Sequence, residues 1–284
     1  MIKSLEASML NLPYSPAELA PLCAKHGIEA VGCTRDLLGD EKKALEVDKL
    51  VKDLGLKWGL MQMPADFYHW DLDDEAFEKA LVTLAKEAAV AEKIGATHAY
   101  NHVWSSGPRE FDENFAWHVE RVRRITEILS DHGVHYGLEF LGPHELRTWQ
   151  KHEFVHSLAG VLAIADAAGG KAGIAFDTFH WYTSTNGCMD DVLWMANHTE
   201  RLVALHMNDA VIGRTFDQQK DMERRLPMET GIINTNDILK RFKATPNNAL
   251  YMIEPFEPAR TRFHDMTAAD AVAEAAEVFA RVEK

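Results

Sequence analysis

Short apolar segments alternate with amphipathic segments along the whole chain of 284 residues, and this alternation constrains the fold more than any other feature. Eight apolar segments have the length and the flanking turn residues of buried strands. These segments are Ser4–Met9, Ile28–Gly32, Lys57–Met63, Thr97–Val103, His135–Leu141, Ala172–Asp177, Leu202–Met207 and Leu250–Glu254. Eight strands that alternate with helices predict the α/β class and a single-domain (β/α)8 barrel, the TIM barrel, over residues 1–284.

The segments between the strands carry signals for helix starts and stops. Ser15-Pro-Ala-Glu18 has the pattern of a capping box with proline at the first helical position. Asp74–Ile94 and Phe111–His132 are amphipathic and each is followed by a glycine, and a last helix is expected to start at Thr267. An open doubly wound sheet is the alternative fold, but no GxGxxG or Walker-type loop follows any strand.

Charge and composition exclude several classes of partner. A net charge of −14 provides no basic surplus to displace counterions, so no nucleic-acid binding is expected. No apolar stretch approaches the roughly 20 residues that span a bilayer, and the N-terminus lacks the apolar core of a signal peptide. The three cysteines form no CxxC pair, which fits a reducing compartment. We therefore expect a cytoplasmic protein without a membrane or nucleic-acid partner.

Four successive predicted strands each place an ionisable residue at or next to their carboxyl end. These residues are Glu139 in GLEFLGP, Asp177 in GIAFDTFHW, His206 in VALHMND and Glu254 in YMIEPF. Strand alternation gives them small inward neighbours such as Gly137 and Ala175, while residues such as Leu138 and Val203 are expected to face the outer helices. The four polar side chains should therefore converge at the mouth of the barrel.

A single acidic residue at a strand end is more often a helix cap or a partner in a loop salt bridge. Four such residues on successive strands favour a shared site instead. Buried carboxylates repel one another unless a cation holds them. Three carboxylates and one imidazole suit one divalent metal ion, with Mn²⁺ expected first and Co²⁺, Mg²⁺ or Zn²⁺ as alternatives.

From Gly137 to Glu254 the sequence resembles the xylose isomerase-like barrel superfamily of sugar-phosphate isomerases and epimerases, and within it the inosose (2-keto-myo-inositol) isomerases. The motifs that carry the resemblance are GLEFLGP, FDTFHWY, LHMND, ERRLP with TGIIN, and IEPF. The resemblance implies that Glu139, Asp177, His206 and Glu254 are metal ligands and that Glu139 and Glu254 are the acid/base pair.

The resemblance also implies that His180 and Arg224 contact substrate oxygens. The family loop usually reads Pro-Gly-x-Gly, whereas this chain has Pro227-Met-Glu-Thr-Gly231, so the choice between Arg224 and Arg225 stays open. This loop belongs to a long segment after Leu202–Met207, and loops of that length are usually functional or disordered.

Several further residues are candidates for substrate contact. Trp104 and Trp181 follow strand ends and can stack on a sugar ring, although simple packing is an equal alternative. His102 closes a strand and Glu6 lies on the first one, with structural roles as alternatives for both. No glycine-rich turn opens a helix after the last two strands, which favours an uncharged substrate over a sugar phosphate.

The chemistry expected of this site is proton transfer next to a carbonyl. The predicted function is a metal-dependent isomerase or epimerase of a small polyhydroxylated keto-sugar or keto-inositol, acting through an enediolate. A lyase on the same scaffold is the alternative: an inosose or dehydroshikimate dehydratase, or an enzyme of 3-keto-glycoside β-elimination. The acidic charge and the single histidine among the four ligands count against an apurinic endonuclease, and the pair of glutamates counts against a non-enzymatic accessory subunit. A homo-oligomer is possible within the family, but no sequence stripe identifies an interface.

Overall fold

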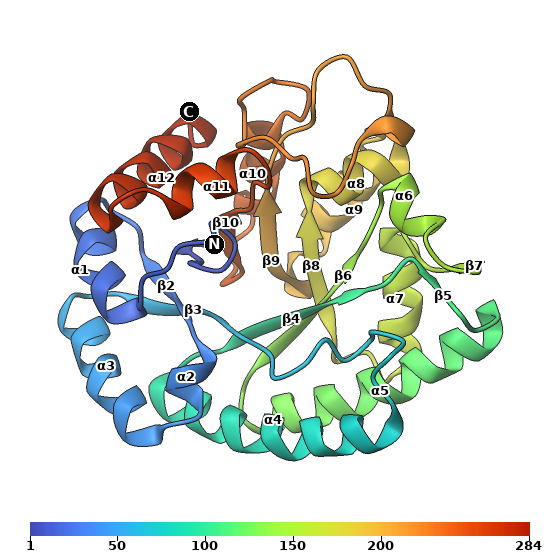
Figure 1. Cartoon of the computed structure of the whole chain (residues 1–284), viewed down its shortest axis with the longest axis horizontal. Coiled ribbons are helices and arrows are strands. Elements are labelled where there is room, and N and C mark those ends of the chain that lie inside the picture. The colour runs from blue at the N-terminus through green and yellow to red at the C-terminus, as the bar shows by residue number, and fades with distance from the viewer.

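Eight parallel strands close into a barrel in the computed structural model, which describes residues 1–284 (Figure 1). The strands follow the order β1-β10-β9-β8-β6-β4-β3-β2 around the barrel, and β1 pairs with both β10 and β2. Their bounds are β1 Ile2–Leu5, β2 Ala30–Cys33, β3 Lys57–Met61, β4 His98–Val103, β6 His135–Phe140, β8 Gly173–Asp177, β9 Leu202–Met207 and β10 Leu250–Ile253. The predicted (β/α)8 barrel is confirmed, and the open sheet is excluded.

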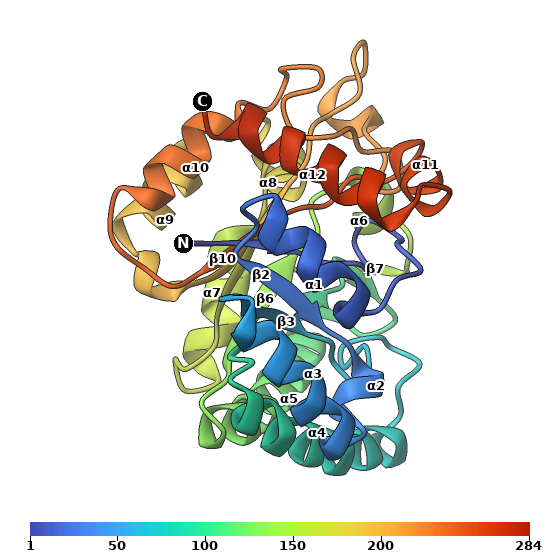
Figure 2. The same cartoon turned by 90° about the vertical axis from the view of Figure 1, so that its left-hand side faces the viewer.

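Helices surround the barrel, and the first helix of the chain packs beside the last one to complete the ring (Figure 2). Their bounds are α1 Pro16–Lys25, α2 Arg35–Leu38, α3 Glu41–Asp53, α4 Asp74–Ile94, α5 Phe111–Asp131, α6 His144–Arg147, α7 Leu158–Ala167, α8 Thr178–Thr185, α9 Asp190–Asn197, α10 Thr235–Lys243, α11 Ala259–His264 and α12 Ala268–Val282. The capping box is present at α1, where the Glu18 carboxylate accepts from the Ser15 N–H at 2.8 Å. None of these helices has the length and apolar content that crossing a bilayer requires.

The core has two parts because the strands are apolar on both faces. A large cluster fills the space between strands and helices, and a small one fills the barrel interior. The interior cluster consists of Met9, Leu60, Ala175, Ala204, Leu250 and Met252.

Val203 does not face the outer helices as strand alternation predicts. The register between β8 and β9 shifts between Ile174 and Ala175, so the alternation of β9 is broken at this point. A Cβ added at Gly137 would lie 3.2 Å from the Val203 Cβ, which places the valine inside the barrel. The glycine therefore makes room for an inward-facing side chain below the site.

The first strand is shorter than the predicted segment Ser4–Met9. It ends at Leu5, and the backbone then turns, with Met9 N–H donating to the Glu6 carbonyl at 3.1 Å and Leu12 N–H to the Ala7 carbonyl at 2.8 Å. The other seven strands differ from the prediction by up to two residues at their ends. Met9 still points into the interior, but from a turn instead of a strand.

A second, two-stranded antiparallel sheet lies outside the barrel and has no counterpart in the sequence prediction. It joins β5 (Ser106–Gly107), in the loop after β4, to β7 (His152–Glu153), in the loop after β6. Strands of two residues carry no periodicity, so only the pairing partner defines them. The sheet ties together two loops at the mouth of the barrel.

The long segment after β9 is ordered by one buried carboxylate. Asp209 accepts hydrogen bonds from the backbone N–H groups of Thr230, Gly231 and Ile233 at 2.8–2.9 Å, and its own backbone pairs with Arg225. Met228 has a φ of 59°, a left-handed conformation at the position where the family has its first glycine. The substitution therefore leaves the loop with a backbone conformation that suits glycine.

Candidate active site

The four predicted metal ligands converge at the carboxyl ends of β6, β8, β9 and β10. Glu139, Asp177, His206 and Glu254 each offer one ligand atom, and these atoms all lie within 4.8 Å of one another. All four side chains are buried. The barrel brings them together because the strand ends of parallel neighbours meet at one face.

Asp177 is held by the start of the helix that follows it. Its Oδ1 accepts from the N–H groups of Phe179 at 2.6 Å and His180 at 2.8 Å, so it caps α8. Its Oδ2 accepts from Asn208 Nδ2 at 2.8 Å and from Arg224 Nη1 at 2.9 Å. Burial raises the pKa of Asp177 to about 6, although the Arg224 guanidinium opposes this effect.

Arg224, rather than Arg225, faces the cluster. Its Nη1 lies 2.9 Å from Asp177 Oδ2 and 3.0 Å from Glu254 Oε2, and its Nη2 lies 2.6 Å from Asp221 Oδ1. Burial lowers the pKa of Arg224, but the three carboxylates outweigh this effect and raise the pKa above its usual value. The guanidinium therefore stays charged. Arg225 instead donates to a backbone carbonyl at the surface.

Glu139 and His206 form the second half of the cluster. His206 Nδ1 lies 2.9 Å from Glu139 Oε1 and 3.6 Å from Glu254 Oε2. Burial lowers the pKa of His206, but the Glu139 and Glu254 carboxylates outweigh it and raise the pKa to about 9. Glu139 Oε2 and His206 Nε2 are buried without a hydrogen-bond partner, so the cluster retains ligand atoms for a cation. A divalent ion fits these residues.

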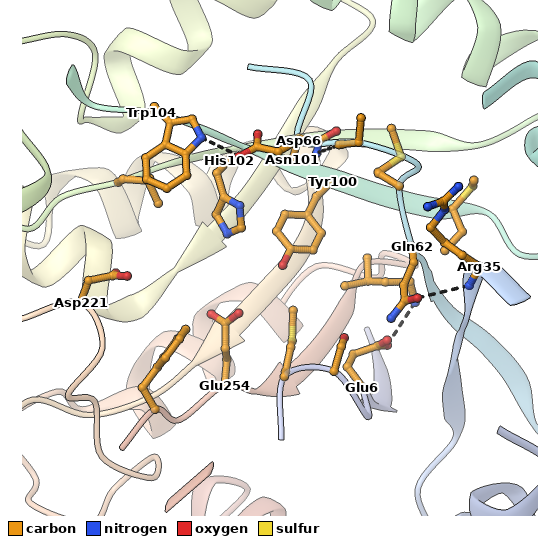
Figure 3. A pocket seen from close by; sticks show the side chains of 18 of the residues that line it. Glu6, Arg35, Gln62, Asp66, Tyr100, Asn101, His102, Trp104, Asp221 and Glu254 are labelled. Atoms are coloured by element: carbon orange, nitrogen blue, oxygen red, sulfur yellow. Dashed lines mark hydrogen bonds between the residues drawn. The ribbon is translucent and has the colours of Figure 1, made fainter. Parts of the chain in front are cut away.

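A cavity of about 510 Å³ opens beside the cluster (Figure 3). Glu254, Arg224, His102, Trp104 and Glu6 are among the residues that line it. Glu139, Asp177 and His206 lie behind this lining, so Glu254 is the one cluster carboxylate that the cavity exposes directly. His102 Nε2 lies 3.1 Å from Glu139 Oε2, without the direction of a hydrogen bond, and stands between that carboxylate and the cavity.

Glu6 lines the cavity, with 5% of its surface exposed. Its Oε1 accepts from Ser4 Oγ at 2.5 Å and from Leu60 N–H at 3.0 Å. Burial raises the pKa of Glu6 to about 7, and these two hydrogen bonds oppose the increase. A Cβ at Gly32 or Gly59 would lie 2.2 Å from a Glu6 carboxylate oxygen, so the two glycines provide the space for this side chain.

Two of the predicted substrate contacts lie outside the cavity lining. Trp181 is 4% exposed and donates from Nε1 to the Cys188 carbonyl at 2.8 Å, because α8 starts at Thr178, directly after Asp177, and turns this indole into the core. His180 is buried behind Arg224, with its Nε2 3.0 Å from Arg224 Nη2. Burial lowers the pKa of His180 well below its usual value, so its ring is neutral and supports the guanidinium.

The cavity also contains polar residues that the sequence analysis did not single out. Tyr100 lies two residues before His102 on β4, and its ring packs edge-on against His206 with centroids 4.7 Å apart. Strand alternation could have identified Tyr100, because it shares the inward face of His102. Asp66 and Asp221 come from loops, where no periodicity points to them.

Comparisons with known proteins identify the family of this chain. The family model of the xylose isomerase-like TIM barrel matches residues 20–282, whereas no curated protein matches the sequence. A xylose isomerase domain protein from Alicyclobacillus acidocaldarius has a similar structure, with 22% identity, a TM-score of 0.81, and coverage of 99% of this chain and 98% of that one.

Two further solved structures share the fold over almost the whole chain. The IOLI protein with a bound zinc atom has 16% identity and a TM-score of 0.76, covering 99% of this chain and 98% of that one. D-psicose 3-epimerase from Clostridium cellulolyticum, solved with D-tagatose, has 14% identity and a TM-score of 0.70 with the same coverage. The family match over residues 20–282 shows that this chain belongs to the xylose isomerase-like TIM barrel family, as the motifs between Gly137 and Glu254 predict.

Proposed function

We propose that this protein is a divalent-metal-dependent isomerase or epimerase that moves a proton next to the carbonyl of a small keto-sugar or keto-inositol. The observation that carries this proposal is the buried group of three carboxylates and one imidazole beside the cavity. The family supports it, since a D-psicose 3-epimerase and a zinc-containing IOLI protein have similar structures.

Glu139, Asp177, His206 and Glu254 would hold the metal ion, for which we propose Mn²⁺ before Zn²⁺, Co²⁺ or Mg²⁺. A bound divalent ion polarises the carbonyl and lowers the energy of the enediolate that proton removal creates. The remaining chemistry belongs to side chains of the chain itself. Arg224, fixed on Asp177 and Glu254, adds positive charge beside the developing oxyanion.

The two glutamates would divide the proton transfer between them. Glu254 lines the cavity and is placed to accept the proton from the carbon next to the carbonyl. Glu139 would return a proton from the other side, where His102 stands 3.1 Å from its Oε2. Return to the opposite face of the same carbon gives epimerisation, and return to the neighbouring carbon gives isomerisation.

The lining of the cavity favours an uncharged, polyhydroxylated substrate. Its two guanidinium groups, Arg35 and Arg224, already pair with carboxylates, Arg35 with Glu87 at 3.0 Å and Arg224 within the cluster. No guanidinium group without a carboxylate partner is therefore left in the lining to balance a phosphate. Glu6 and His102 offer hydrogen-bonding groups to hydroxyls at different points of the cavity.

The test is proton exchange in D2O. The Mn²⁺-loaded protein is incubated with keto-inositols, ketohexoses, 3-keto-glucosides and dehydroshikimate, and the reaction is followed by proton NMR. We expect deuterium at a carbon next to the carbonyl together with a new isomer. The double variant Glu139→Gln, Glu254→Gln should lose the exchange, whereas Glu46→Gln on the surface of α3 should retain it.

Two results would contradict the proposal. Exchange that persists in the double glutamine variant excludes these carboxylates as the acid/base pair. An unsaturated product places the protein among the lyases, because a β-leaving group is then lost from the same enediolate instead of a proton being returned.

A further inference from the structure

Three tryptophans from three different loops meet at the mouth of the cavity. Trp70 follows β3, Trp104 follows β4 and Trp149 follows α6. Their ring centroids lie 5.1–5.6 Å apart, and each pair is steeply inclined, at 62–83°. Trp104 lines the cavity, whereas Trp149 is 55% exposed, so the group extends from the cavity to the surface.

This group is more than the packing of three apolar side chains. A single exposed apolar residue needs no explanation, but contiguous apolar side chains that reach from a cavity to the surface are typical of ligand-binding grooves. Trp149 keeps more than half of its surface free and packs against Trp104, which lines the cavity. A face left open beside a cavity is the arrangement expected where a ligand ring supplies the missing contact.

The loops that carry Trp104 and Trp149 are fastened to each other. β5 and β7 pair Ser106 with Glu153, and Ser106 Oγ donates to the Leu146 carbonyl at 2.6 Å and accepts from Gln150 N–H at 3.1 Å. The small sheet therefore fixes the position of both indoles before any ligand arrives. A rigid support of this kind reduces the ordering that binding requires.

Beside Trp104 lies a carboxylate with a free oxygen. Trp104 Nε1 donates to Asp66 Oδ2 at 2.7 Å, while the buried Asp66 Oδ1 has no hydrogen-bond partner, and Asp66 lines the cavity. An unpartnered acceptor next to an indole suits a ligand that presents both an apolar face and a hydroxyl. A sugar ring has both features.

The aromatic part of the cavity adjoins the reacting part, since the ring centroids of Trp104 and His102 lie 6.5 Å apart. In Figure 3, Glu254 lies on the same side of Tyr100 as Trp104 and Asp66, and the cavity continues on the other side to Glu6, Gln62 and Arg35. The volume of about 510 Å³ lies within the range of roughly 300–1,000 Å³ found for pockets that hold drug-sized ligands. The cavity thus has room for a substrate larger than one sugar ring.

We propose that Trp104, Trp149 and Asp66 form a subsite for a second hydroxylated ring, so that the substrate is a keto-sugar carried in a glycoside. The assignment of the reacting ring rests on the proposed function, whereas the subsite itself does not. The second ring stacks on the indoles, and one of its hydroxyls donates to Asp66 Oδ1.

The test measures binding, so it is independent of catalysis. Methyl β-D-glucoside, phenyl β-D-glucoside and cellobiose have no ketone and cannot react, and their binding to the full-length protein is measured by titration calorimetry. We expect cellobiose to bind more tightly than the methyl glucoside by about 2- to 12-fold for the stacked ring. Trp149→Ala should abolish this advantage, and Ile212→Ala, which removes another exposed apolar residue, should preserve it.

Asp66→Asn tests the hydroxyl contact, because asparagine can still accept from Trp104 Nε1 but replaces the free acceptor by a donor. This variant should weaken the binding of cellobiose and leave the affinity for the phenyl glucoside unchanged. Equal binding of cellobiose and methyl glucoside, including no binding of either, would overturn the subsite, as would an advantage that survives in Trp149→Ala. If the phenyl glucoside binds as tightly as cellobiose and Asp66→Asn changes neither affinity, the proposal that the second ring carries hydroxyls would be overturned. If the parent protein shows no proton exchange but still binds cellobiose more tightly than methyl glucoside, only the proposed function would be refuted and the subsite would stand.

Discussion

Glu6 should make the stability of the metal-free protein depend on pH. It is 5% exposed, and its carboxylate accepts from Ser4 and Leu60 but has no cation within hydrogen-bonding distance. Burial raises its pKa from the ordinary 4.5 to about 7. A shift of that size corresponds to about 3 kcal/mol of unfavourable free energy once the group is ionised in the folded state.

The sign follows from where the proton is held. Between about pH 4.5 and 7 the folded protein keeps a proton on Glu6 that the unfolded chain has released. The free energy of unfolding therefore falls as the pH rises through this window, and the contribution of Glu6 is constant above it. Glu6→Gln removes the titration, and the amide oxygen can still accept from Ser4 and Leu60.

Urea unfolding in EDTA, at intervals from pH 4.5 to 8.5, measures this effect. The stability of Glu6→Gln relative to the parent protein should increase by about 3 kcal/mol across the range. Glu46→Gln, an exposed residue of α3, is the matched control and should show a constant difference. A constant difference for Glu6→Gln, within about 0.5 kcal/mol, would refute the assignment of a buried, protonated carboxyl.

Three further predictions concern the support of the site. Gly59→Ala should lower the free energy of unfolding by about 1–3 kcal/mol in urea titrations, because its Cβ would meet Glu6 Oε1 at 2.2 Å and Ser4 Oγ at 2.3 Å; unchanged stability would show that this carboxyl can move aside. Asp209→Ala should cost a similar amount, about 1–3 kcal/mol, and speed limited proteolysis within residues 210–233, since it leaves backbone N–H groups without their acceptor. Mn²⁺ at 100 times its Kd should stabilise the parent by about 2.7 kcal/mol in thermal melts, and Asp177→Asn should remove most of this gain; equal gains in both proteins would exclude Asp177 as a ligand.

The pattern of the sequence determines the barrel and the face on which its site lies. The apolar alternation of eight segments could be identified without any contact information, and so could the polar residues at the ends of four successive strands. Both follow from period-two geometry, which acts within a single strand. Glu139, Asp177, His206 and Glu254 accordingly meet as predicted.

Local patterns do not determine features that depend on distant partners. The first strand ends at Leu5 because Glu6 turns toward Leu60, and Val203 faces inward because the register of β9 shifts against β8. Trp181 enters the core because α8 begins at Thr178, directly after Asp177. Each outcome depends on a neighbour that lies far away in the sequence or on a geometry that residue type alone does not encode.

The same division applies to the site. The sequence by itself determined the residue types of the cluster and the strands that carry them, because strand alternation is a property of the local backbone. Only the tertiary structure decided that Arg224 rather than Arg225 reaches the cluster and that Trp149 joins Trp104 at the mouth of the cavity. Both lie in loops whose course is set by the long-range hydrogen bonds of Asp209 and Ser106, and no periodic pattern records such bonds.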